Sequence, residues 1–419
     1  MFLVLINRKN KMNYTESHLE SATLDWLKEL GYGVSFGPDI SADPKDASTK
    51  TELTERQYGQ VLLENRLCAA MAKINPKIPE ETLGDAIKKV VAVAYSSPNL
   101  LTTNHAFHKM LTEGVDVEYQ RTDGSVAGDK VYLLDTKNID NNDWLVVNQL
   151  TVIENNHNRR PDVVVYVNGL PLVLFELKNP AKESATVKQA FRQIQTYQKE
   201  IPSIFTYNTL CIISDGLDAR VGTFSADFER FMKWPTIDGA KMAPKHVPEM
   251  EVLIKGIFIK ERLLDLIQNF LIFEKDEKSF IKKLAAYHQY FATNKAVERT
   301  LKATSEKGDH RGGVVWHTQG SGKSLTMVFY ARKIIQKLDN PTLVVITDRN
   351  DLDGQLKDVF VNCQELLRQT PVQAQGRDHL KDLLRVASGG IVFTTIQKFF
   401  PETKGGKYDL LSDRRNIEI

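Results

Sequence analysis

Apolar residues in the first half of the chain recur with two different spacings. Between residues 14 and 30 they stand three or four positions apart, and Gly31 follows as a C-cap, which predicts a helix. Helical spacing also covers 54–75 and 184–201. Continuous or alternating apolar runs predict strands over 129–136, 144–154, 209–216 and 219–224, and a hairpin over 161–180.

The second half begins after a stretch, 231–252, that is punctuated by proline, lysine and glycine. We expect a domain boundary near residue 250. Helical spacing follows over 259–273 and 279–303, and strands (312–316, 342–347, 389–395) then alternate with helices (324–338, 355–367). Such alternation predicts a parallel sheet with crossover helices.

Composition narrows the class of protein only slightly. A chain of 419 residues usually exceeds one core, and 42% hydrophobic with 26% charged residues describes an ordinary soluble globular protein. The net charge of +2 does not indicate which kind of partner the chain binds. The three cysteines are far apart, which argues against a disulfide framework and structural zinc and fits a reducing cytoplasm. No apolar stretch approaches the roughly 18 residues of a membrane span. Residues 1–12 place apolar before basic residues, so we expect a leader or a misassigned start, with Met12 the better beginning.

The predicted hairpin at 161–180 carries the first candidate chemistry. Asp162 precedes its first strand, and Glu176 and Lys178 stand two apart at the end of its second, where they share a face. Two carboxylates can hold Mg²⁺ beside a scissile phosphate, and a lysine can orient the attacking water. The alternative is an exposed strand end, where such charges are common.

The register of the hairpin decides between these interpretations. A two-residue Asn168-Gly169 turn with regular flanks would pair Asp162 with Phe175 and point it away from Glu176. We therefore expect a three-residue loop, with Tyr166 opposite Leu170, or another odd offset such as a bulge.

A glycine-rich stretch between a predicted strand and helix carries the second candidate chemistry. In "HTQGSGKS" the backbone of Thr318, Gln319, Gly320, Ser321 and Gly322 would cradle phosphate, Lys323 would reach the β- and γ-phosphates, and Ser324 would bind Mg²⁺. The stretch departs from G-x-x-x-x-G-K-[ST] only at His317. An unoccupied Gly-Ser loop is the alternative. The pattern predicts ATP binding.

Segments around this loop resemble the first motor domain of superfamily 2 helicases and translocases. "HTQGSGKS" resembles motif I, "TDRNDLDGQ" motif Ia, and "FTTIQKF" the segment that follows. The resemblance implies contacts to the DNA backbone, which would suit the side chains of Thr347, Arg349, Thr394, Thr395 and Gln397. Gln289 resembles the glutamine that reads adenine, with an ordinary surface glutamine as the alternative. No D-E-x-[HD] motif follows before Ile419, so we expect an incomplete motor that binds ATP weakly without cycling.

The helix predicted after the hairpin extends the nuclease resemblance. Gln193 and Tyr197 stand four apart and share a helical face. This Q-x-x-x-Y resembles the motif that follows PD-(D/E)xK in RecB-like nucleases and in restriction subunits of type I enzymes. Glu20 resembles the acid of that family's first core helix, and Glu16 is the rival for this place; a solvated charge is the alternative for both.

The order of these motifs resembles the amino-terminal part of the restriction (HsdR) subunit of type I restriction–modification enzymes. The resemblance implies an α/β chain with a PD-(D/E)xK endonuclease domain at 13–250, a helical linker at 251–285 and a RecA-like motor domain at 286–419 that ends before the Walker B motif. It implies Mg²⁺ and ATP as cofactors. Its implied partners are double-stranded DNA and separate methyltransferase and specificity subunits.

Two other functions fit the same residues. One is a nuclease–helicase of DNA repair or phage defence that acts without methyltransferase partners. The other is a non-catalytic subunit that binds DNA or a partner. No zinc-finger spacing or helix-turn-helix is evident, so we expect contacts to phosphates, for which these basic residues flank the hairpin: Arg159, Arg160, Lys182, Lys188 and Arg192.

Overall fold

A computed structural model describes residues 15–418 apart from 44–45, 121–122, 180–185, 277–278, 339, 387, 402–405, 407, 409 and 415. The expected leader at 1–12 and Lys182 lie outside the described residues. By its contacts the chain divides into two compact units, one of residues 1–268 with 282–284 and one of residues 269–281 with 285–419.

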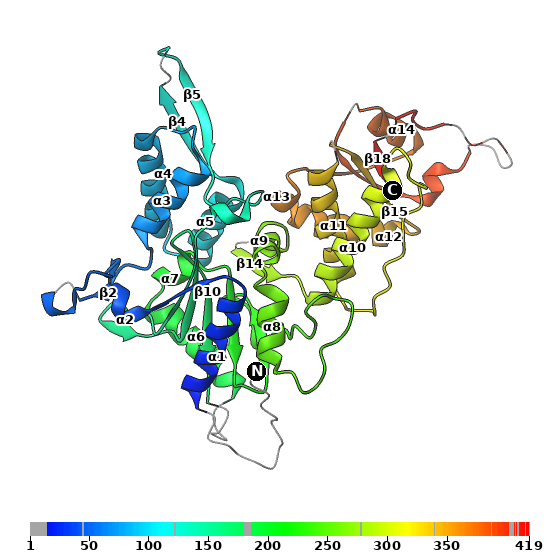
Figure 1. The fold of residues 1–419 in the computed structure, drawn as a ribbon. Coiled ribbons are helices and arrows are strands. Elements are labelled where there is room, and N and C mark those ends of the chain that lie inside the picture. Colours follow the sequence, from blue (N-terminus) through cyan, green and yellow to red (C-terminus); the bar gives the residue numbers. More distant parts are fainter. Residues whose placement is uncertain are drawn as a thin grey trace. The chain divides into compact units, whose positions relative to one another are not determined.

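The first unit mixes helices with short strands around one larger sheet (Figure 1). Its elements are α1 (Glu16–Glu29), β1 (Gly33–Phe36), α2 (Gly37–Ile40), β2 (Ser41–Ala42), β3 (Arg56–Gln57), α3 (Glu64–Ile74), α4 (Glu80–Ala92), α5 (Leu100–Glu113), β4 (Val115–Gln120), β5 (Val126–Val131), β6 (Trp144–Asn148), β7 (Val152–Glu154), β8 (His157–Arg159), β9 (Val163–Val167), β10 (Leu170–Leu177), α6 (Val187–Glu200), α7 (Ser203–Thr206), β11 (Leu210–Ser214), β12 (Ala219–Gly222), α8 (Glu249–Ile257) and α9 (Lys260–Asn269).

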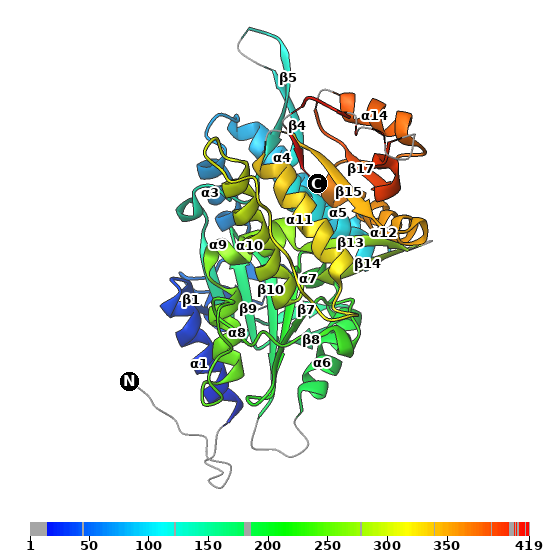
Figure 2. The same cartoon turned by 90° about the vertical axis from the view of Figure 1, so that its right-hand side faces the viewer.

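The main sheet of this unit is six-stranded, with the order β1-β6-β9-β10-β11-β12. The pairs β1–β6 and β10–β11 are parallel, and β6–β9, β9–β10 and β11–β12 are antiparallel. Helices α1 and α8 lie on one side of the strands and α6 on the other (Figure 2). Because both faces are covered, β9 and β10 are apolar almost throughout and are buried along their whole length.

Several elements of the first unit differ from the sequence-based expectation. The helix expected over 54–75 begins only at Glu64, because residues 56–57 pair with β2 instead. The strand expected over 144–154 is broken into β6 and β7, and Gln149 at the break has a positive φ of 56°. The predicted strands at 209–216 and 219–224 are confirmed as β11 and β12.

The stretch expected as a helical linker, 251–285, is folded differently. Helices α8 and α9 bury apolar side chains such as Leu253, Ile257 and Leu263, and residues up to Gln268 belong to the first unit. Residues 279–284, expected to be helical, form strand β14 instead, which pairs with β13 in a two-stranded sheet. These apolar side chains are buried in the core of the first unit.

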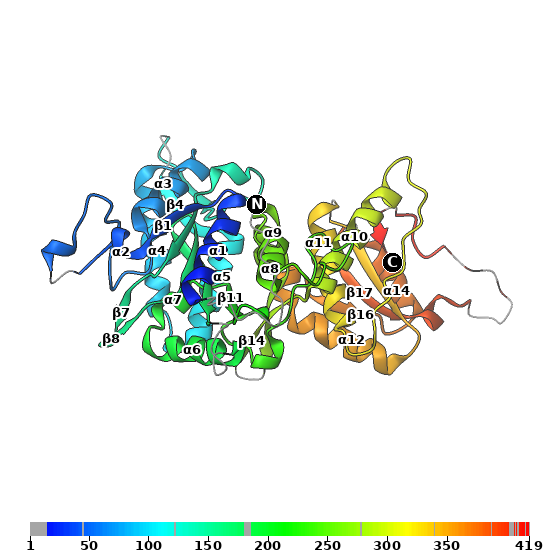
Figure 3. The same ribbon diagram turned by 60° about the horizontal axis from the view of Figure 1, so that its bottom comes forward.

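The second unit is a four-stranded parallel sheet with helices around it (Figure 3). Its strand order is β16-β17-β15-β18. Its elements are β13 (Leu271–Asp276), β14 (Ser279–Leu284, shared with the first unit), α10 (Tyr287–Thr304), α11 (Lys323–Lys337), β15 (Thr342–Thr347), α12 (Asn350–Asn362), α13 (Gln364–Leu367), β16 (Pro371–Gln373), α14 (Arg377–Arg385), β17 (Ile391–Thr395) and β18 (Ile417–Glu418).

The strand expected at 312–316 is absent from this sheet. Residues 312–316 have no regular structure, and Val314 and Trp316 are 89% and 90% exposed. Among the described residues this segment pairs with no strand, whereas β15 pairs along its length with β17 and at Thr342 and Leu343 with β18. The expectation of a buried strand before the glycine-rich loop is therefore wrong for this structure.

Helices in the described part of the chain are all too short or too polar to cross a membrane.

Candidate metal and nucleotide sites

The β9–β10 hairpin closes through a two-residue turn and then changes register. Leu170 pairs with Val167 and Pro171 with Tyr166, but the next pairs are Val173 with Val165 and Phe175 with Val163. The offset arises at Leu172, which is an extra residue in β10 and therefore a β-bulge. One step beyond the last pair, Glu176 lies opposite Asp162.

This geometry corrects one expectation and confirms another. The three-residue loop is wrong, because Asn168 and Gly169 alone form the turn with φ values of 54° and 75°. The alternative odd offset, a bulge, is present. Directly opposed residues of antiparallel strands share a face, so the bulge brings Asp162 and Glu176 together.

Contacts around Asn168 explain why the turn stays at two residues. The buried Asn168 amide donates to the carbonyls of Leu133 (2.8 Å) and Asn142 (2.9 Å to Oδ1), and its Oδ1 accepts from the Asp143 N–H at 2.7 Å. A Cβ on Gly169 would lie 2.4 Å from the Leu63 carbonyl oxygen. The tip of the hairpin is thus packed inside the unit, and a longer loop would not fit.

Side chains at the open end of the hairpin form a tight charged set. Asp162 Oδ2 accepts from the Leu177 N–H at 2.6 Å. Lys178 donates from Nζ to Glu176 Oε1, and Lys178 is partly exposed whereas Asp162 and Glu176 are buried. The second oxygen of Glu176, Oε2, is buried and has no hydrogen-bond partner among the residues that the structure describes.

Ionisation of these groups follows from burial and from their mutual charge. Burial, reinforced by the charge of Glu176, raises the pKa of Asp162 to about 8. Burial raises the pKa of Glu176 to about 7, although Lys178 opposes the rise. Burial acts to lower the pKa of Lys178, but Glu176 and Asp162 outweigh it and raise that pKa. Two buried carboxylates that repel each other favour a bound cation.

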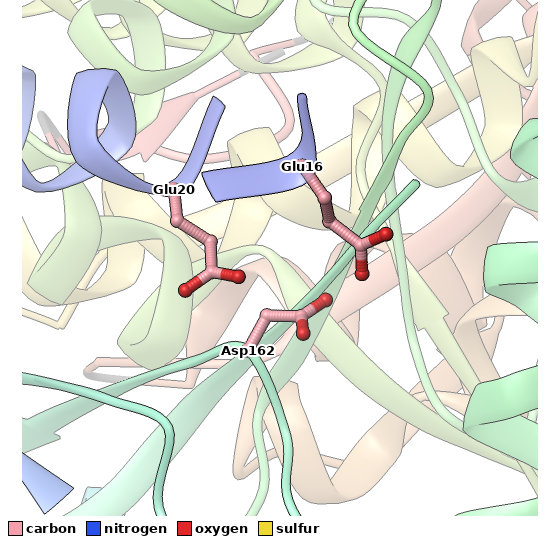
Figure 4. Close-up of side chains that lie close together, drawn as sticks. All are labelled: Glu16, Glu20 and Asp162. Atoms are coloured by element: carbon pink, nitrogen blue, oxygen red, sulfur yellow. The ribbon is translucent and has the colours of Figure 1, made fainter. Parts of the chain in front are cut away.

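Helix α1 adds two more carboxylates to the set. Glu16 and Glu20, one helical turn apart, point toward Asp162 (Figure 4), and one oxygen from each of the three lies within 4.8 Å of the others. Burial raises the pKa of Glu20. Sequence reasoning treated Glu16 and Glu20 as rivals for one place, whereas the structure brings both to Asp162.

Gln149 is a further site residue that sequence reasoning missed. Its Nε2 donates to Glu20 Oε2 at 2.7 Å, and its backbone N–H donates to the Asp162 carbonyl at 2.9 Å. The left-handed φ of this non-glycine residue aims the side chain at α1. Gln149 lies between two strands, and no pattern in the sequence identifies its left-handed backbone conformation.

Tyr197 and Gln193 both lie on helix α6, and Gln193 acts on the pKa of Tyr197, so the two share a face of this helix. Tyr197 is buried, and its hydroxyl donates to the Arg160 carbonyl at 3.5 Å. Burial, followed by the charges of Glu176 and Asp162, raises the pKa of Tyr197, and Gln193 opposes the rise. The tyrosine therefore stays protonated beside the carboxylates, as a hydrogen-bond donor rather than a base.

The donor set suits a hard divalent cation. It consists of carboxylate oxygens from Asp162, Glu16 and Glu20, which are the kind of ligand that Mg²⁺ prefers, and the buried carboxylate of Glu176 lies near enough for its charge to raise the pKa of Asp162. The unpartnered Glu176 Oε2 is the particular observation that fits, because a buried carboxylate oxygen without a donor is costly unless a cation neutralises it.

Basic residues near this set have different surroundings. Arg159 pairs with Glu200, and Lys188 lies 5.4 Å from the centre of the Phe228 ring. Arg160 is exposed, and its charge acts on Glu20.

The glycine-rich loop of the second unit ends at the first residue of α11. Gly320 and Gly322 have φ values of 78° and 79°, which glycine adopts without strain, and Lys323 begins the helix. Thr318, Gln319 and Gly320 are exposed. Lys323 Nζ donates to the carbonyls of His317 (3.2 Å) and Thr318 (3.0 Å). These hydrogen bonds fold the lysine back onto its own loop.

Residues of α10 hold the same loop. Gln289 is buried; its Nε2 donates to the Gly322 carbonyl at 2.9 Å, and its Oε1 accepts from the Ala286 N–H at 2.8 Å. His288 Nε2 lies 3.0 Å from the Ser321 carbonyl oxygen. An adenine contact by Gln289 stays a prediction, and it would have to replace both amide hydrogen bonds.

The predicted DNA-contacting residues of this unit differ in how far their side chains are exposed to solvent. Thr394 and Thr395 are buried in β17, so their side chains do not face solvent. Arg349 is exposed, and the exposed Gln397 donates to the Asp348 carbonyl at 3.0 Å. Of the five predicted contacts, Arg349 and Gln397 are therefore exposed, and Thr347 is half-buried with its hydroxyl donating to the Arg349 carbonyl at 3.3 Å.

A carboxylate and lysine set on one sheet, followed by a glycine-rich loop at a helix N-terminus, is typical of a metal-dependent nuclease joined to a nucleotide-binding unit. Two family models match these parts of the chain. Residues 13–230 match "Type I restriction enzyme R protein N terminus", and residues 288–419 match "SWI2/SNF2 ATPase". The first match covers more than half of the 419 residues, so the chain belongs to the type I restriction enzyme R protein family.

Curated relatives agree with this assignment. The chain is 42% identical over 411 residues to the type I restriction enzyme HindI endonuclease subunit of Haemophilus influenzae, which covers 96% of this chain and 38% of the relative. It is 34% identical over 426 residues to the putative type I restriction enzyme MjaIXP endonuclease subunit of Methanocaldococcus jannaschii, which covers 96% and 39%. The chain thus spans about two fifths of the length of these relatives.

Proposed function

We propose that this chain is the nuclease and ATP-binding part of a type I restriction endonuclease subunit, which hydrolyses phosphodiester bonds of duplex DNA with Mg²⁺. The observation that carries the proposal is the bulge at Leu172, which sets Asp162 opposite Glu176 and beside Lys178. We infer that the first unit has the PD-(D/E)xK fold and that the second is RecA-like.

Each site residue of the first unit has a proposed role in metal binding, catalysis or DNA contact. Asp162 and Glu176, assisted by Glu20 and Glu16, would hold Mg²⁺, which when bound supplies activation of water and compensation of charge at the phosphate. Lys178 stays protonated because its pKa is raised, so it acts as a donor toward the attacked phosphate or its water. Tyr197 would hold the Arg160 backbone through its hydroxyl, and Gln193 would act on Tyr197. Arg160 would contact the DNA phosphates from the rim.

The second unit would bind ATP at 318–324, with Lys323 on the β- and γ-phosphates and Ser324 toward Mg²⁺. Release of Lys323 from the carbonyls of His317 and Thr318 is the step that nucleotide binding requires of the loop. ATP-dependent movement on DNA, and assembly with methyltransferase and specificity subunits, are proposed from the resemblance to type I restriction enzymes and to superfamily 2 motors.

The first experiment is nicking of supercoiled plasmid by the purified chain with Mg²⁺. Wild type and Lys199→Ala, a change at an exposed lysine of α6, should nick equally, and Lys178→Ala should nick at least about tenfold more slowly. Equal rates for wild type and Lys178→Ala would remove Lys178 from the chemistry and favour a non-catalytic DNA-binding subunit.

A second experiment separates the restriction subunit from a nuclease–helicase that acts alone. The chain is mixed with purified modification and specificity subunits of a type I enzyme from the same source and passed over a sizing column. Co-elution supports the restriction assignment. Separate elution, together with Mg²⁺-dependent nicking, favours the stand-alone nuclease.

A further inference from the structure

A buried polar network lies beside the start of β10, whereas the carboxylates of the candidate metal site lie at the other end of this strand. It joins Lys282 of β14, Asn104 of α5 and the residues 208–209 that precede β11, all of which are at most 1% exposed. Lys282 lies between the ranges matched by the two families, 13–230 and 288–419, yet it belongs to the first unit.

The network begins at the Lys282 ammonium. Lys282 Nζ donates to Asn104 Oδ1 at 2.9 Å and to the Asn208 carbonyl at 2.8 Å, and it lies 5.4 Å from the centre of the Phe224 ring. Asn104 Nδ2 donates to the same Asn208 carbonyl at 2.8 Å and to the carbonyls of Phe205 (2.9 Å) and Thr206 (3.1 Å). Lysine and asparagine thus hold the turn at 205–208 from two sides.

The network ends at the bulge. The Leu172 carbonyl accepts from the Thr209 N–H at 2.7 Å and from Thr209 Oγ1 at 2.8 Å, and Asn208 Nδ2 lies 3.4 Å from it. A bulged residue leaves the strand ladder, so its buried carbonyl needs donors from elsewhere. The turn held by Lys282 supplies them.

We propose that Lys282 is a positioning residue of the nuclease site, which keeps Asp162 opposite Glu176 by holding residues 208–209 against the Leu172 bulge. The proposal rests on the proposed nuclease function. Without the bulge, regular pairing from the Asn168-Gly169 turn would set Asp162 opposite Phe175 and turn it to the other face of the sheet. Lys282 of β14 thereby acts near the start of β10, through residues 208–209, on the geometry at the other end of that strand.

The burial of the Lys282 amine agrees with a role in holding Asn104 and Asn208. The pKa of Lys282 is lowered to about 7 by burial, and the side chain is nevertheless held by two oxygen acceptors. An apolar residue would fill the same space without desolvating a charge, so the hydrogen bonds to Asn104 and Asn208 are what this lysine contributes.

The test compares Lys282→Met with Lys283→Met in the full chain. Lys283 is the next residue of β14 and is only partly buried. Amide hydrogen exchange of the segment 173–178 is the main readout, because the Leu177 N–H is protected by Asp162 only in the bulged register. Exchange there should become at least about tenfold faster in Lys282→Met and stay unchanged in Lys283→Met, with α11 unchanged in both.

Nicking kinetics give the second readout. Lys282→Met should lower kcat at least about tenfold and leave the KM for DNA unchanged, since positioning of Asp162 affects the reaction rather than DNA contacts. If the wild type does not nick, the proposed function fails, and the exchange comparison still decides the positioning role.

Variants of Thr209 decide the case if Lys282→Met does not fold. Thr209→Val removes the hydroxyl donor to Leu172 and preserves shape, and Thr209→Ser keeps the donor. Faster exchange at 173–178 in Thr209→Val, with wild-type exchange in Thr209→Ser, supports the proposal. Unchanged exchange at 173–178 in Thr209→Val and in any folded Lys282→Met protein would overturn it.

Discussion

Asp162 faces Glu176 because Leu172 is a bulge. The two carboxylates belong to strands joined by a two-residue turn, and one extra residue in β10 shifts the pairing that a regular hairpin would have. Burial raises the pKa of both, the charge of Glu176 adds to the rise at Asp162, and Glu176 keeps one oxygen without a partner among the described residues. This relationship is the structural basis of the predicted metal site.

Removing the charge of Asp162 should stabilise the chain when no metal is present. The pKa of Asp162 is about 8 in the folded chain against 3.8 ordinarily, so the folded state holds a proton that the unfolded chain releases. The stability from this group is present below pH 3.8 and is lost as the pH rises through 8. In EDTA, Asp162→Asn should therefore match wild type near pH 4 and exceed its unfolding free energy by at least ~1 kcal/mol at pH 8.

Denaturant unfolding of both proteins at the two pH values checks this prediction. Asn can still accept the Leu177 N–H, so the variant keeps that contact. A variant less stable than wild type at pH 8 would show that the Asp162 charge is already compensated.

Gln149 should act on the metal site through Glu20. Gln149→Asn keeps a residue that tolerates the left-handed φ but cannot reach Glu20 Oε2, so Mn²⁺ affinity should fall about tenfold with little change in stability. Calorimetric titration with Mn²⁺ measures the affinity. Gln195→Asn on the exposed side of α6 is the control, and equal affinities in both variants would argue against the link through Glu20.

Lys282 should make stability depend on pH in the opposite sense to Asp162. Its pKa is about 7 in the folded chain against 10.5 ordinarily, so between these values the unfolded chain binds a proton that the folded chain lacks. The unfolding free energy of wild type relative to Lys282→Met should rise with pH over 7–9, by up to ~1.4 kcal/mol per unit.

Unfolding at several pH values in this range tests that slope. In wild type the neighbouring groups His108 and Cys211 are both neutral over this range, because burial lowers the pKa of His108 well below 6.5 and raises the pKa of Cys211 to about 12. A flat difference would mean that Lys282 keeps an ordinary pKa.

The phosphate loop should work independently of the nuclease residues. Lys323→Ala should weaken binding of a fluorescent ATP analogue at least about tenfold and leave Mg²⁺-dependent nicking unchanged, because Lys323 contacts only its own loop among the described residues. Lys337→Ala, an exposed lysine at the other end of α11, is the control. Equal nucleotide affinity in the two variants would exclude 318–324 as the ATP site.

Sequence spacing predicted those parts of the site that depend on local periodicity. Glu176 and Lys178 share a face at a strand end because they are two residues apart in a strand. Gln193 and Tyr197 share a face of α6 because they are four residues apart in a helix. An odd offset between the two strands was also expected, because the metal site needs Asp162 and Glu176 on one face. The sequence did not predict that the offset is a bulge rather than a longer turn, because the turn is held by contacts of Asn168 with Asp143 and Asn142, which no local pattern reveals.

Longer-range packing accounts for the remaining differences. Residues 279–284 have helical spacing but form β14, where Lys282 reaches the Asn104 and Asn208 network. Residues 312–316 have strand-like composition but pair with no strand among the described residues. In both segments the available partner, rather than the propensity of the residues, decides the structure.

The most direct measurement of the central claim is binding of Mn²⁺, monitored by electron paramagnetic resonance, to wild type, Glu176→Gln and Glu200→Gln. Glu200 is a carboxylate of the same unit that pairs with Arg159. The account predicts that wild type and Glu200→Gln bind Mn²⁺ with equal affinity and that Glu176→Gln binds it at least about tenfold more weakly. Equal affinity of all three proteins would contradict a metal site built on Asp162 and Glu176.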